Sequence, residues 1–432
     1  MTKDRRRRGK PRTPPRPRPR GRVPQGESRV GERMTVDVEG VAHGGHCVAR
    51  HEGQVLFVRH ALPGEQVVVE VTSGTTGSTF LRADAVEVLR ASPERREPPC
   101  PYAGPGQCGG CDWQHTSVEF SRELKARVVR EQLQRLARLD VPVEVEPVPG
   151  DQDGLRWRTR VELAVGGAGR AGMRKHRSHD VMPVDDCLIA VQEIADSGVL
   201  QRSWPAGTSG VDVARSSTGE LAVVPLPVSG DVPTLTELVT IDGREACLEV
   251  SARGFWQVHP GAAETFADTV LEALDLREGE HVLDLYCGVG LFAEAVAEVV
   301  GESGRVLGVE GDRTGAAEGV HNLRHRPNAA IEEGDVLARL SDDTIARTLG
   351  GRVDAVVLDP PRTGAGREVM QQVLGQDPRV VVYVACDPAA LARDVAYAAE
   401  SGYGLVGLRA FDAFPMTHHV ECVAILEPDA AG

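Results

Sequence analysis

The alternation of apolar and polar positions divides the chain into a β-rich first part and a last part in which strands and helices alternate. Residues 28–90 contain short runs of period two, such as MTVDVEGV and GEQVVVEVT, separated by Gly and Pro. Several such strands within about 60 residues predict a small β-barrel. Residues 117–138 instead space Phe, Leu and Val along one face, as a helix does.

From about residue 255 onward, apolar strands such as HVLDLY, RVLGVE, VDAVVLD and RVVVYVA are separated by helical stretches. This order predicts an α/β fold with a doubly wound, largely parallel sheet, in which ligands bind at the carboxyl ends of the strands. We therefore expect four parts: a disordered basic arm (1–27), a β-barrel (28–91), a mixed central domain (92–254) and the doubly wound domain (255–432).

Charge is distributed unevenly along the 432 residues. The net charge is −14, yet residues 1–22 contain eleven Lys or Arg and one Asp. This Pro- and Arg-rich arm either attracts phosphate groups or serves only to keep the chain in solution. No apolar run approaches the ~20 residues of a membrane span, and no signal peptide is evident, so a cytoplasmic protein is expected.

The first candidate site is a cofactor pocket at the start of the doubly wound domain. Asp284 lies in a strand that leads into the glycine turn CGVG, and Glu310 ends the next strand. A carboxylate at that position can accept hydrogen bonds from ribose hydroxyls, and Asp335 after the third strand could face an adenine. The turn lacks the third glycine of a dinucleotide fingerprint. This favours S-adenosylmethionine over a nicotinamide cofactor or an empty fold.

The second candidate site is a set of reactive groups at strand ends. Cys386 follows the strand VVVYVA, Asp359 opens the motif DPPR, and Glu421 begins the last strand. A thiolate that adds to carbon 6 of a pyrimidine makes carbon 5 nucleophilic; a donor to the ring oxygen and a base for the carbon-5 proton complete the chemistry. Cys386, Asp359 and Glu421 could supply these functions in turn. A lone cysteine at a strand end is otherwise commonly core packing.

Nine cysteines in a reducing compartment are not expected to form disulfides. Three of them, Cys100, Cys108 and Cys111, lie within twelve residues, and Cys187 follows later. Four such cysteines can bind zinc or an iron–sulfur cluster, and the spacing does not separate the two. The others, Cys47, Cys247, Cys287 and Cys422, are expected to be packing residues.

The motifs GFWQVHP, DPPR, CDP and FPMTHHVE resemble those of the RNA uracil-5-methyltransferase family, and the resemblance extends from about residue 28 onward. It implies a class I enzyme that methylates tRNA or ribosomal RNA with S-adenosylmethionine. It implies that Cys386 is the nucleophile and Glu421 the proton acceptor. It also implies a cofactor site formed by Gln257, Tyr286, Glu310 and Asp359, with Asp335 flanking the adenine.

The resemblance has two further implications. The first barrel resembles the TRAM RNA-binding domain, whose binding face could include Arg50, Arg59 and Arg82, although composition alone favours solvated loop charges. A subset of the family carries a 4Fe–4S cluster on cysteines in this order, which implies a cluster on Cys100, Cys108, Cys111 and Cys187. Methyl transfer consumes no electron, so such a cluster would serve structure or RNA binding.

The expected partner is RNA, with the target base flipped out of its stack, and no membrane or obligate protein partner is expected. Ribosomal RNA, 23S in particular, is preferred because the cysteine set accompanies that subset, with tRNA as the alternative. Two other classes compete: a thiol oxidoreductase that uses Cys386 and the cluster, and a non-catalytic RNA-binding or redox-sensing protein on a methyltransferase fold.

Overall fold

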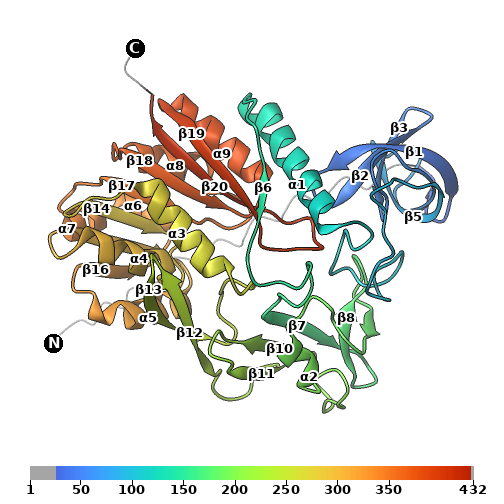
Figure 1. The fold of residues 1–432 in the computed structure, drawn as a ribbon, viewed down its shortest axis with the longest axis horizontal. Helices are drawn as coiled ribbons and strands as arrows, with labels where there is room; N and C mark the ends of the chain where they lie inside the picture. The colour runs from blue at the N-terminus through green and yellow to red at the C-terminus, as the bar shows by residue number, and fades with distance from the viewer. Residues whose placement is uncertain (1–25, 430–432) are drawn as a thin grey trace, which may run out of the picture.

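The computed structural model describes residues 26–429, and the predicted basic arm lies outside them except for its last two residues. Three bodies follow one another along the chain: a barrel, a central β-rich region and a large α/β sheet (Figure 1). No helix within residues 26–429 is long and apolar enough to cross a membrane.

The barrel confirms the period-two pattern of the first part. Five strands close on themselves in the order β1-β2-β3-β5-β4. Residues of alternate positions, such as Val36, Leu56 and Val69, fill its interior. The strands are β1 (Arg33–Ala42), β2 (His46–His51), β3 (Gln54–Arg59), β4 (Gln66–Ser73) and β5 (Phe80–Arg90).

The central region begins with helix α1 (Val118–Gln132), which continues into a π-helical turn at Leu133–Ala137. Ser117 caps the helix by accepting a hydrogen bond from the Phe120 amide at 3.2 Å. A five-stranded sheet of order β11-β10-β7-β8-β9 and a hairpin β12-β13 follow. Their bounds are β7 (Arg160–Val165), β8 (Ala171–Arg174), β9 (Val181–Pro183), α2 (Gln192–Asp196), β10 (Gly210–Arg215), β11 (Leu221–Leu226), β12 (Thr234–Ile241) and β13 (Arg244–Ser251).

The α/β part contains an eight-stranded sheet of order β16-β15-β14-β17-β18-β20-β19-β6. It confirms the predicted doubly wound class, with β14 to β18 parallel and β20 antiparallel to both of its neighbours. The strands are β14 (His281–Leu285), β15 (Arg305–Glu310), β16 (Ala329–Glu333), β17 (Ala355–Leu358), β18 (Val380–Ala385), β19 (Tyr403–Asp412) and β20 (Glu421–Pro428).

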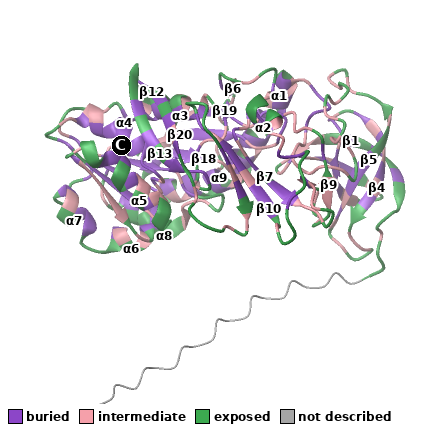
Figure 2. Cartoon of the chain, turned by 90° about the horizontal axis from the view of Figure 1, so that it is seen from below, coloured by how far each residue is buried: buried purple, intermediate pink, exposed green. Residues whose placement is uncertain are grey.

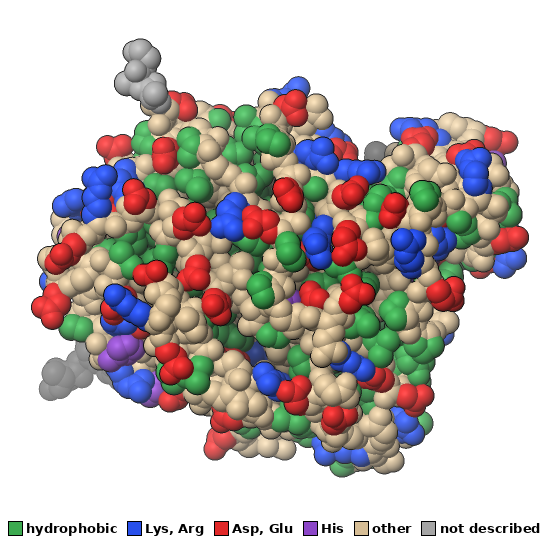
Figure 3. All heavy atoms as spheres, in the orientation of Figure 1, with side chains coloured by type: hydrophobic (Ala, Val, Ile, Leu, Met, Phe, Trp, Pro, Cys, Tyr) green, Lys and Arg blue, Asp and Glu red, His purple; other side chains and the backbone are tan. Residues whose placement is uncertain are grey.

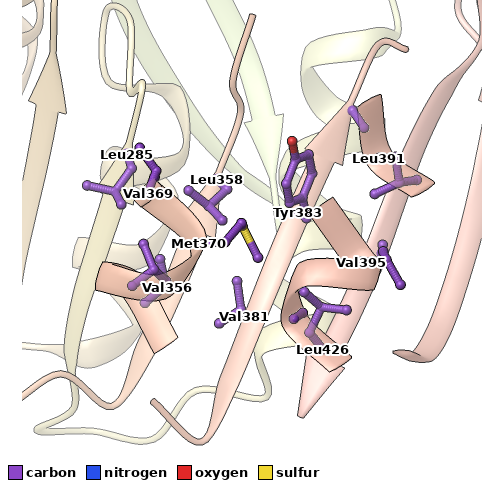
Figure 4. Close-up of a cluster of buried hydrophobic side chains, with 14 of the residues drawn as sticks. Leu285, Val356, Leu358, Val369, Met370, Val381, Tyr383, Leu391, Val395 and Leu426 are labelled. Atoms are coloured by element: carbon purple, nitrogen blue, oxygen red, sulfur yellow. The ribbon is translucent and has the colours of Figure 1, made fainter. Parts of the chain in front are cut away.

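Helices cover both faces of this sheet, as strands that are apolar on both sides require. All six residues of β18 are buried, and Figure 4 shows Val381, Tyr383 and Leu426 packed against Met370 and Val395 of the covering helices. The helices are α3 (Ala262–Leu274), α4 (Leu291–Val300), α5 (Arg313–Asn322), α6 (Val336–Ser341), α7 (Thr344–Leu349), α8 (Gly366–Leu374) and α9 (Pro388–Glu400).

The edge strand of this sheet comes from a distant part of the sequence. Strand β6 (Val145–Pro147) pairs in parallel with β19, so that Val145 lies opposite Ala410. Helix α1 also packs on α9, and the teal helix beside the red strands in Figure 1 shows this contact. Burial is accordingly continuous from the large sheet into the central strands β7 and β10 (Figure 2).

A buried ion pair fixes α1 to this sheet. The Lys125 ammonium is fully buried and pairs with the Asp412 carboxylate at the end of β19, which is 1% exposed. Lys125 Nζ also donates to the Phe414 carbonyl at 3.1 Å. Desolvation lowers the pKa of Lys125, and Asp412 opposes that change. The pair therefore anchors the segment that follows β19.

Replacing Lys125 by Met should leave the Asp412 charge buried without its main partner. We expect the free energy of unfolding of the large sheet to fall by about 3–5 kcal/mol, measured from urea titrations. The control Arg127→Ala removes an exposed pair with Glu123 on the same helix and should change it by less than about 1 kcal/mol. The double variant Lys125→Met with Asp412→Leu should recover most of the lost stability. If Lys125→Met and the control Arg127→Ala lowered the free energy of unfolding equally, this role of Lys125 would be contradicted.

Candidate active site

Cys386 and Glu421 are brought together by strand register. Strand β18 pairs with β20 so that Ala385 lies opposite Cys422. In an antiparallel pair the next position places Cys386 opposite Glu421, and two residues opposite each other share one face of the sheet. Cys422 is fully buried on the other face, beside its partner Ala385. Cys422, the cysteine on the neighbouring strand, therefore points away from the Cys386 side chain.

The Cys386 side chain is held rigidly between a strand and a helix. Asp387 caps α9 by accepting from the Ala390 amide at 2.8 Å, and Pro388 takes the first helical position. The positive end of the α9 dipole therefore lies next to the sulfur, which favours a thiolate. Desolvation, then Glu421 and Asp359, raise the pKa of Cys386 to about 12, and the Arg362 guanidinium opposes them.

Glu421 lies at the start of β20 with 6% of its surface exposed. Desolvation, followed by the neighbouring Asp359 carboxylate, raises the pKa of Glu421 well above its usual range, while Arg362 again opposes the rise. Glu421 is itself one of the groups that raise the pKa of Cys386, because two adjacent anions repel in a poorly solvated site. The pair therefore tends to carry one negative charge rather than two.

A cavity opens beside these groups at the carboxyl ends of the strands. It is lined by Phe255, Trp256, Gln257, Tyr286, Cys287, Gly288, Val289, Leu291, Phe292 and Asp359. Gly288 has φ +54°, and a Cβ there would meet nothing within 4 Å, so its backbone faces open space. Tyr286 is held at φ +65°, a strained conformation for a bulky residue that is commonly found at functional sites. Three predicted cofactor residues, Gln257, Tyr286 and Asp359, thus line one hollow.

One acidic residue, Asp359, lines this hollow, and Asp284 and Glu310 lie close enough to it for their charges to interact. Asp284 is fully buried, its carboxyl oxygens have no close hydrogen-bond partner among the described residues, and desolvation followed by Asp359 raises its pKa to about 8. Desolvation and then Glu310 raise the pKa of Asp359 to about 7. A ligand that carries positive charge would relieve this repulsion. The residues therefore fit a cationic cofactor such as S-adenosylmethionine.

The predicted residues Glu310 and Asp335 do not line the hollow, although Glu310 contacts Gly288, which does. The Glu310 carboxylate accepts from the Gly288 amide at 2.8 Å and from the Asp312 amide at 2.6 Å, and each oxygen keeps a lone pair for a ligand hydroxyl. Asp335 is exposed and caps α6 by accepting from the Ala338 amide at 3.0 Å. Its charge raises the pKa of Tyr286, which places Asp335 on the Tyr286 side of the hollow.

The four predicted ligand cysteines meet at a separate cavity. Cys100, Cys108, Cys111 and Cys187 all line it, together with apolar residues such as Met173 and Ile189. Desolvation raises the pKa of each thiol, to about 11 for Cys187. No three His, Cys, Asp or Glu side chains within residues 26–429 are grouped as the ligands of one metal ion would be. The sulfurs thus surround a space rather than converge on a point.

Two expectations about the other residues prove partly wrong. Cys47, Cys287 and Cys422 are buried as predicted, but Cys247 is exposed on β13, because its strand belongs to a two-stranded hairpin with one open face. Arg50 is exposed on the barrel, where it pairs with Glu39.

The other two arginines proposed for the barrel face differ from Arg50. Arg59 does not lie on an exposed face, because its side chain is buried against Asp112. Arg82 is only partly exposed and lies over the Phe80 ring. The surface in Figure 3 mixes basic and acidic side chains without a broad basic patch.

Two residues next to the reacting groups were given no role from the sequence. Arg362, in the DPPR motif, lowers the pKa of both Cys386 and Glu421. Phe255 is 71% exposed although it lines the cofactor hollow. A large exposed aromatic ring at a pocket mouth is a common contact for a nucleic acid base. Both residues belong to short motifs, DPPR and GFWQVHP, and this position was the sequence signal that could have marked them as part of the site.

Comparison with known proteins identifies the family of the chain. The profile of the TRAM domain matches residues 27–86, and that of the family described as tRNA (Uracil-5-)-methyltransferase matches residues 228–429. An uncharacterized RNA methyltransferase of Streptomyces coelicolor is 47% identical over 94% of this chain and 95% of its own length. One from Bifidobacterium longum is 37% identical over 90% of this chain and 95% of its own.

A solved structure has the same architecture. The Pyrococcus abyssi tRNA (uracil-54, C5)-methyltransferase, crystallised with S-adenosyl-L-homocysteine, superposes with a TM-score of 0.66. The match covers 91% of this chain and all of that one, at 21% identity. This likeness shows that the barrel, the central region and the α/β sheet form a fold already known.

The acidic hollow predicts that the affinity for S-adenosylmethionine depends on pH. Asp359, with a raised pKa of about 7, is protonated below that value and must lose its proton to face a sulfonium. Affinity should therefore rise about tenfold from about pH 6 to pH 8, measured by calorimetry. S-adenosylhomocysteine shares the ammonium but lacks the sulfonium and should show a smaller rise. In the Asp359→Asn variant the affinities for the two ligands should rise with pH to the same extent. If the two affinities already rose equally in the unaltered protein, this role of Asp359 would be contradicted.

Proposed function

Because the chain belongs to the RNA uracil-5-methyltransferase family and begins with a TRAM domain, we propose that it methylates carbon 5 of a uridine in RNA through a covalent bond between Cys386 and carbon 6. The observation that carries the proposal is the strand register that sets Cys386 opposite Glu421 beside the acidic hollow. S-adenosylmethionine supplies an electrophilic methyl group when bound there.

The shared charge of Cys386 and Glu421 fits each step of this reaction. The Cys386 thiolate adds to carbon 6 while Glu421 holds the proton, so the two anions never coexist. The sulfur becomes a neutral thioether, and carbon 5 of the resulting enolate takes the methyl group. Glu421 can then release its proton to solvent, because the neighbouring charge has disappeared. This accounts for the single proton that the overall methylation produces.

The second half of the cycle returns both groups to their starting state. Ionised Glu421 removes the proton from carbon 5, and its burial makes it a strong base because the neutral acid is favoured there. Elimination expels the Cys386 thiolate and restores the double bond. After methyl transfer no sulfonium remains, so Asp359, whose pKa is near neutrality, can take up a proton and donate a hydrogen bond to the ring oxygen during this elimination.

The predicted cofactor residues take matching parts in this proposal. Glu310 would hold the ribose hydroxyls, and Asp335 would lie beside the adenine. Gln257 and Tyr286 would shape the pocket, because both line the hollow. Phe255 offers its exposed ring for stacking on an unpaired base, which would hold the target uridine after it leaves the RNA stack.

Two variants separate the steps of the proposed reaction. Cys386→Ala should lose 5-methyluridine formation and form no protein–RNA adduct. Glu421→Gln should still form the methylated adduct but release it at least about a hundredfold more slowly, because it lacks a base. Denaturing gels and mass spectrometry of the adduct would measure both. Cys247→Ser, an exposed cysteine away from the hollow, is the matched control and should retain full activity. An active Cys386→Ala protein would rule out the covalent mechanism.

We also propose a 4Fe–4S cluster on Cys100, Cys108, Cys111 and Cys187. The four thiols surround one cavity lined by apolar residues. A single zinc ion would need all four sulfurs about 2.3 Å from one point, whereas a cluster brings its own sulfide and takes cysteines at separate corners.

Reconstitution without oxygen should give about four iron and four sulfide per chain, measured by chemical analysis and visible absorbance. Cys187→Ser should lower both contents. The exposed Cys247→Ser should leave them unchanged. One zinc per chain without sulfide would overturn the proposal.

We propose ribosomal RNA, 23S in particular, as the substrate, on the strength of this cysteine set. The alternative is tRNA, the substrate for which the matching family is named. Mass mapping of 5-methyluridine in total RNA from cells with and without the gene distinguishes them. Loss of the nucleoside from 23S RNA supports the first, and loss from tRNA supports the second.

A further inference from the structure

One buried carboxylate joins the cysteine region to the segment that precedes Glu421. Asp112 directly follows Cys111, and its backbone amide donates to the Met416 carbonyl at 3.0 Å. Asp112 Oδ2 accepts from the His418 backbone amide at 3.1 Å and lies 2.6 Å from His418 Nδ1. The carboxylate therefore fixes both the backbone and the ring of His418. The segment concerned, residues 413–420, is called the β19–β20 loop below.

The barrel closes the same junction from the other side. Arg59 Nη2 lies 3.4 Å from Asp112 Oδ1, and its side chain is 4% exposed. Gly45, in the β1–β2 turn with φ +77°, leaves no room for a side chain: a Cβ there would lie 2.8 Å from Asp112 Cγ and 3.0 Å from His418 Cβ. Asp112 is thus packed between the barrel, the cysteine region and the β19–β20 loop, and its carboxylate is 10% exposed.

From His418 a short series of contacts leads to the reacting groups. The His418 and His419 rings lie 4.1 Å apart between centroids, and His419 Nε2 lies 3.4 Å from Arg362 Nη2. A guanidinium can only donate, so His419 Nε2 is the acceptor and the ring is neutral. Desolvation and the neighbouring cations lower the pKa of His419 to about 3, which agrees with this state.

We propose that Asp112 is a positioning residue that fixes His418 and, through His419, holds the Arg362 guanidinium beside Cys386 and Glu421. The cysteine region would thereby set the reactivity of the nucleophile from a distance. The proposal rests on the proposed function, because it gives Arg362 its importance through Cys386 and Glu421.

The charged groups around Cys386 show why the position of Arg362 matters. Glu421 on β20, Asp359 before Arg362, and Asp387 at the start of α9 all raise the pKa of the thiol. Asp387 is itself partly balanced by His43 of the barrel at 3.0 Å. Among the groups that act on the sulfur, Arg362 is the cation that favours the thiolate. A displaced guanidinium would leave three acids around it.

The test measures the thiol directly, without RNA. Iodoacetamide alkylation of Cys386 at about pH 8, followed by peptide mass spectrometry, reports the thiolate fraction. A rise of about one unit in the pKa of Cys386 lowers that fraction tenfold but raises the intrinsic reactivity of the thiolate, so Asp112→Ala should slow alkylation about threefold to fourfold. Asp112→Asn, which keeps an acceptor for His418, should slow it less. In turnover, kcat should fall while KM for S-adenosylmethionine stays unchanged.

The matched control is Asp185→Ala. Asp185 accepts a hydrogen bond from Tyr102 at 3.1 Å in the same cysteine region, and among residues 26–429 it forms no hydrogen bond or ion pair with the β19–β20 loop. The Asp185→Ala variant should leave the alkylation rate of Cys386 unchanged. It therefore distinguishes a general destabilisation of the cysteine region from the specific effect of losing the Asp112 carboxylate. If Asp112→Ala proves unfolded by circular dichroism, Asp112→Asn carries the same test with the smaller expected effect.

A double-variant experiment decides whether Asp112 acts through Arg362. Arg362→Gln should slow alkylation at least as much as Asp112→Ala, and combining the two should add nothing further. Additive effects, or unchanged alkylation in both folded Asp112 variants, would overturn the proposal. The alkylation result does not depend on any methyl product, so the failure of this proposal is distinguishable from the failure of the proposed function.

Discussion

The register between β18 and β20 is the constraint on which the site depends. Antiparallel pairing places Ala385 opposite Cys422, and so sets Cys386 opposite Glu421. A slip by one residue would reverse the faces of the strand and turn Cys422 toward the hollow instead. The buried side chains on both faces, such as Tyr383 on one and Val382 on the other, oppose any such slip. The packing of the core therefore determines the spacing of the chemistry.

Charge in this site is arranged around an excess of acids. Asp284, Asp359 and Glu421 lie in or next to strands of one sheet, and poor solvation together with repulsion from nearby carboxylates favours their protonated forms. Arg362 and the start of α9 provide limited compensation at the sulfur. A positively charged ligand would relieve this repulsion, as expected of a site for a sulfonium cofactor.

Sequence patterns predicted the elements better than they predicted the contacts between them. The regular patterns in residues 28–90 and 255–432 were sufficient to predict the barrel and the doubly wound sheet. The apolar positions of each strand show whether one or both of its faces are buried. The motif around Cys386 marked a strand end followed by a helix cap. Arg59 was misplaced because a charged residue in a strand pattern usually faces water. Its burial depends on Asp112, which is 53 residues away, and no periodic pattern records such a pairing.

The parallel pairing of β6 with β19 has a consequence for how the molecule is made. The two strands are separated by more than 250 residues, so β6 and helix α1 leave the ribosome long before β19 exists. The large sheet cannot be completed until nearly the whole polypeptide has been synthesised. Such distant pairing slows folding, since the ends of a very long loop must meet. During translation the apolar face of α1 and the unpaired edge of β6 are thus exposed to the cell, and this stage is where assistance from chaperones would matter most.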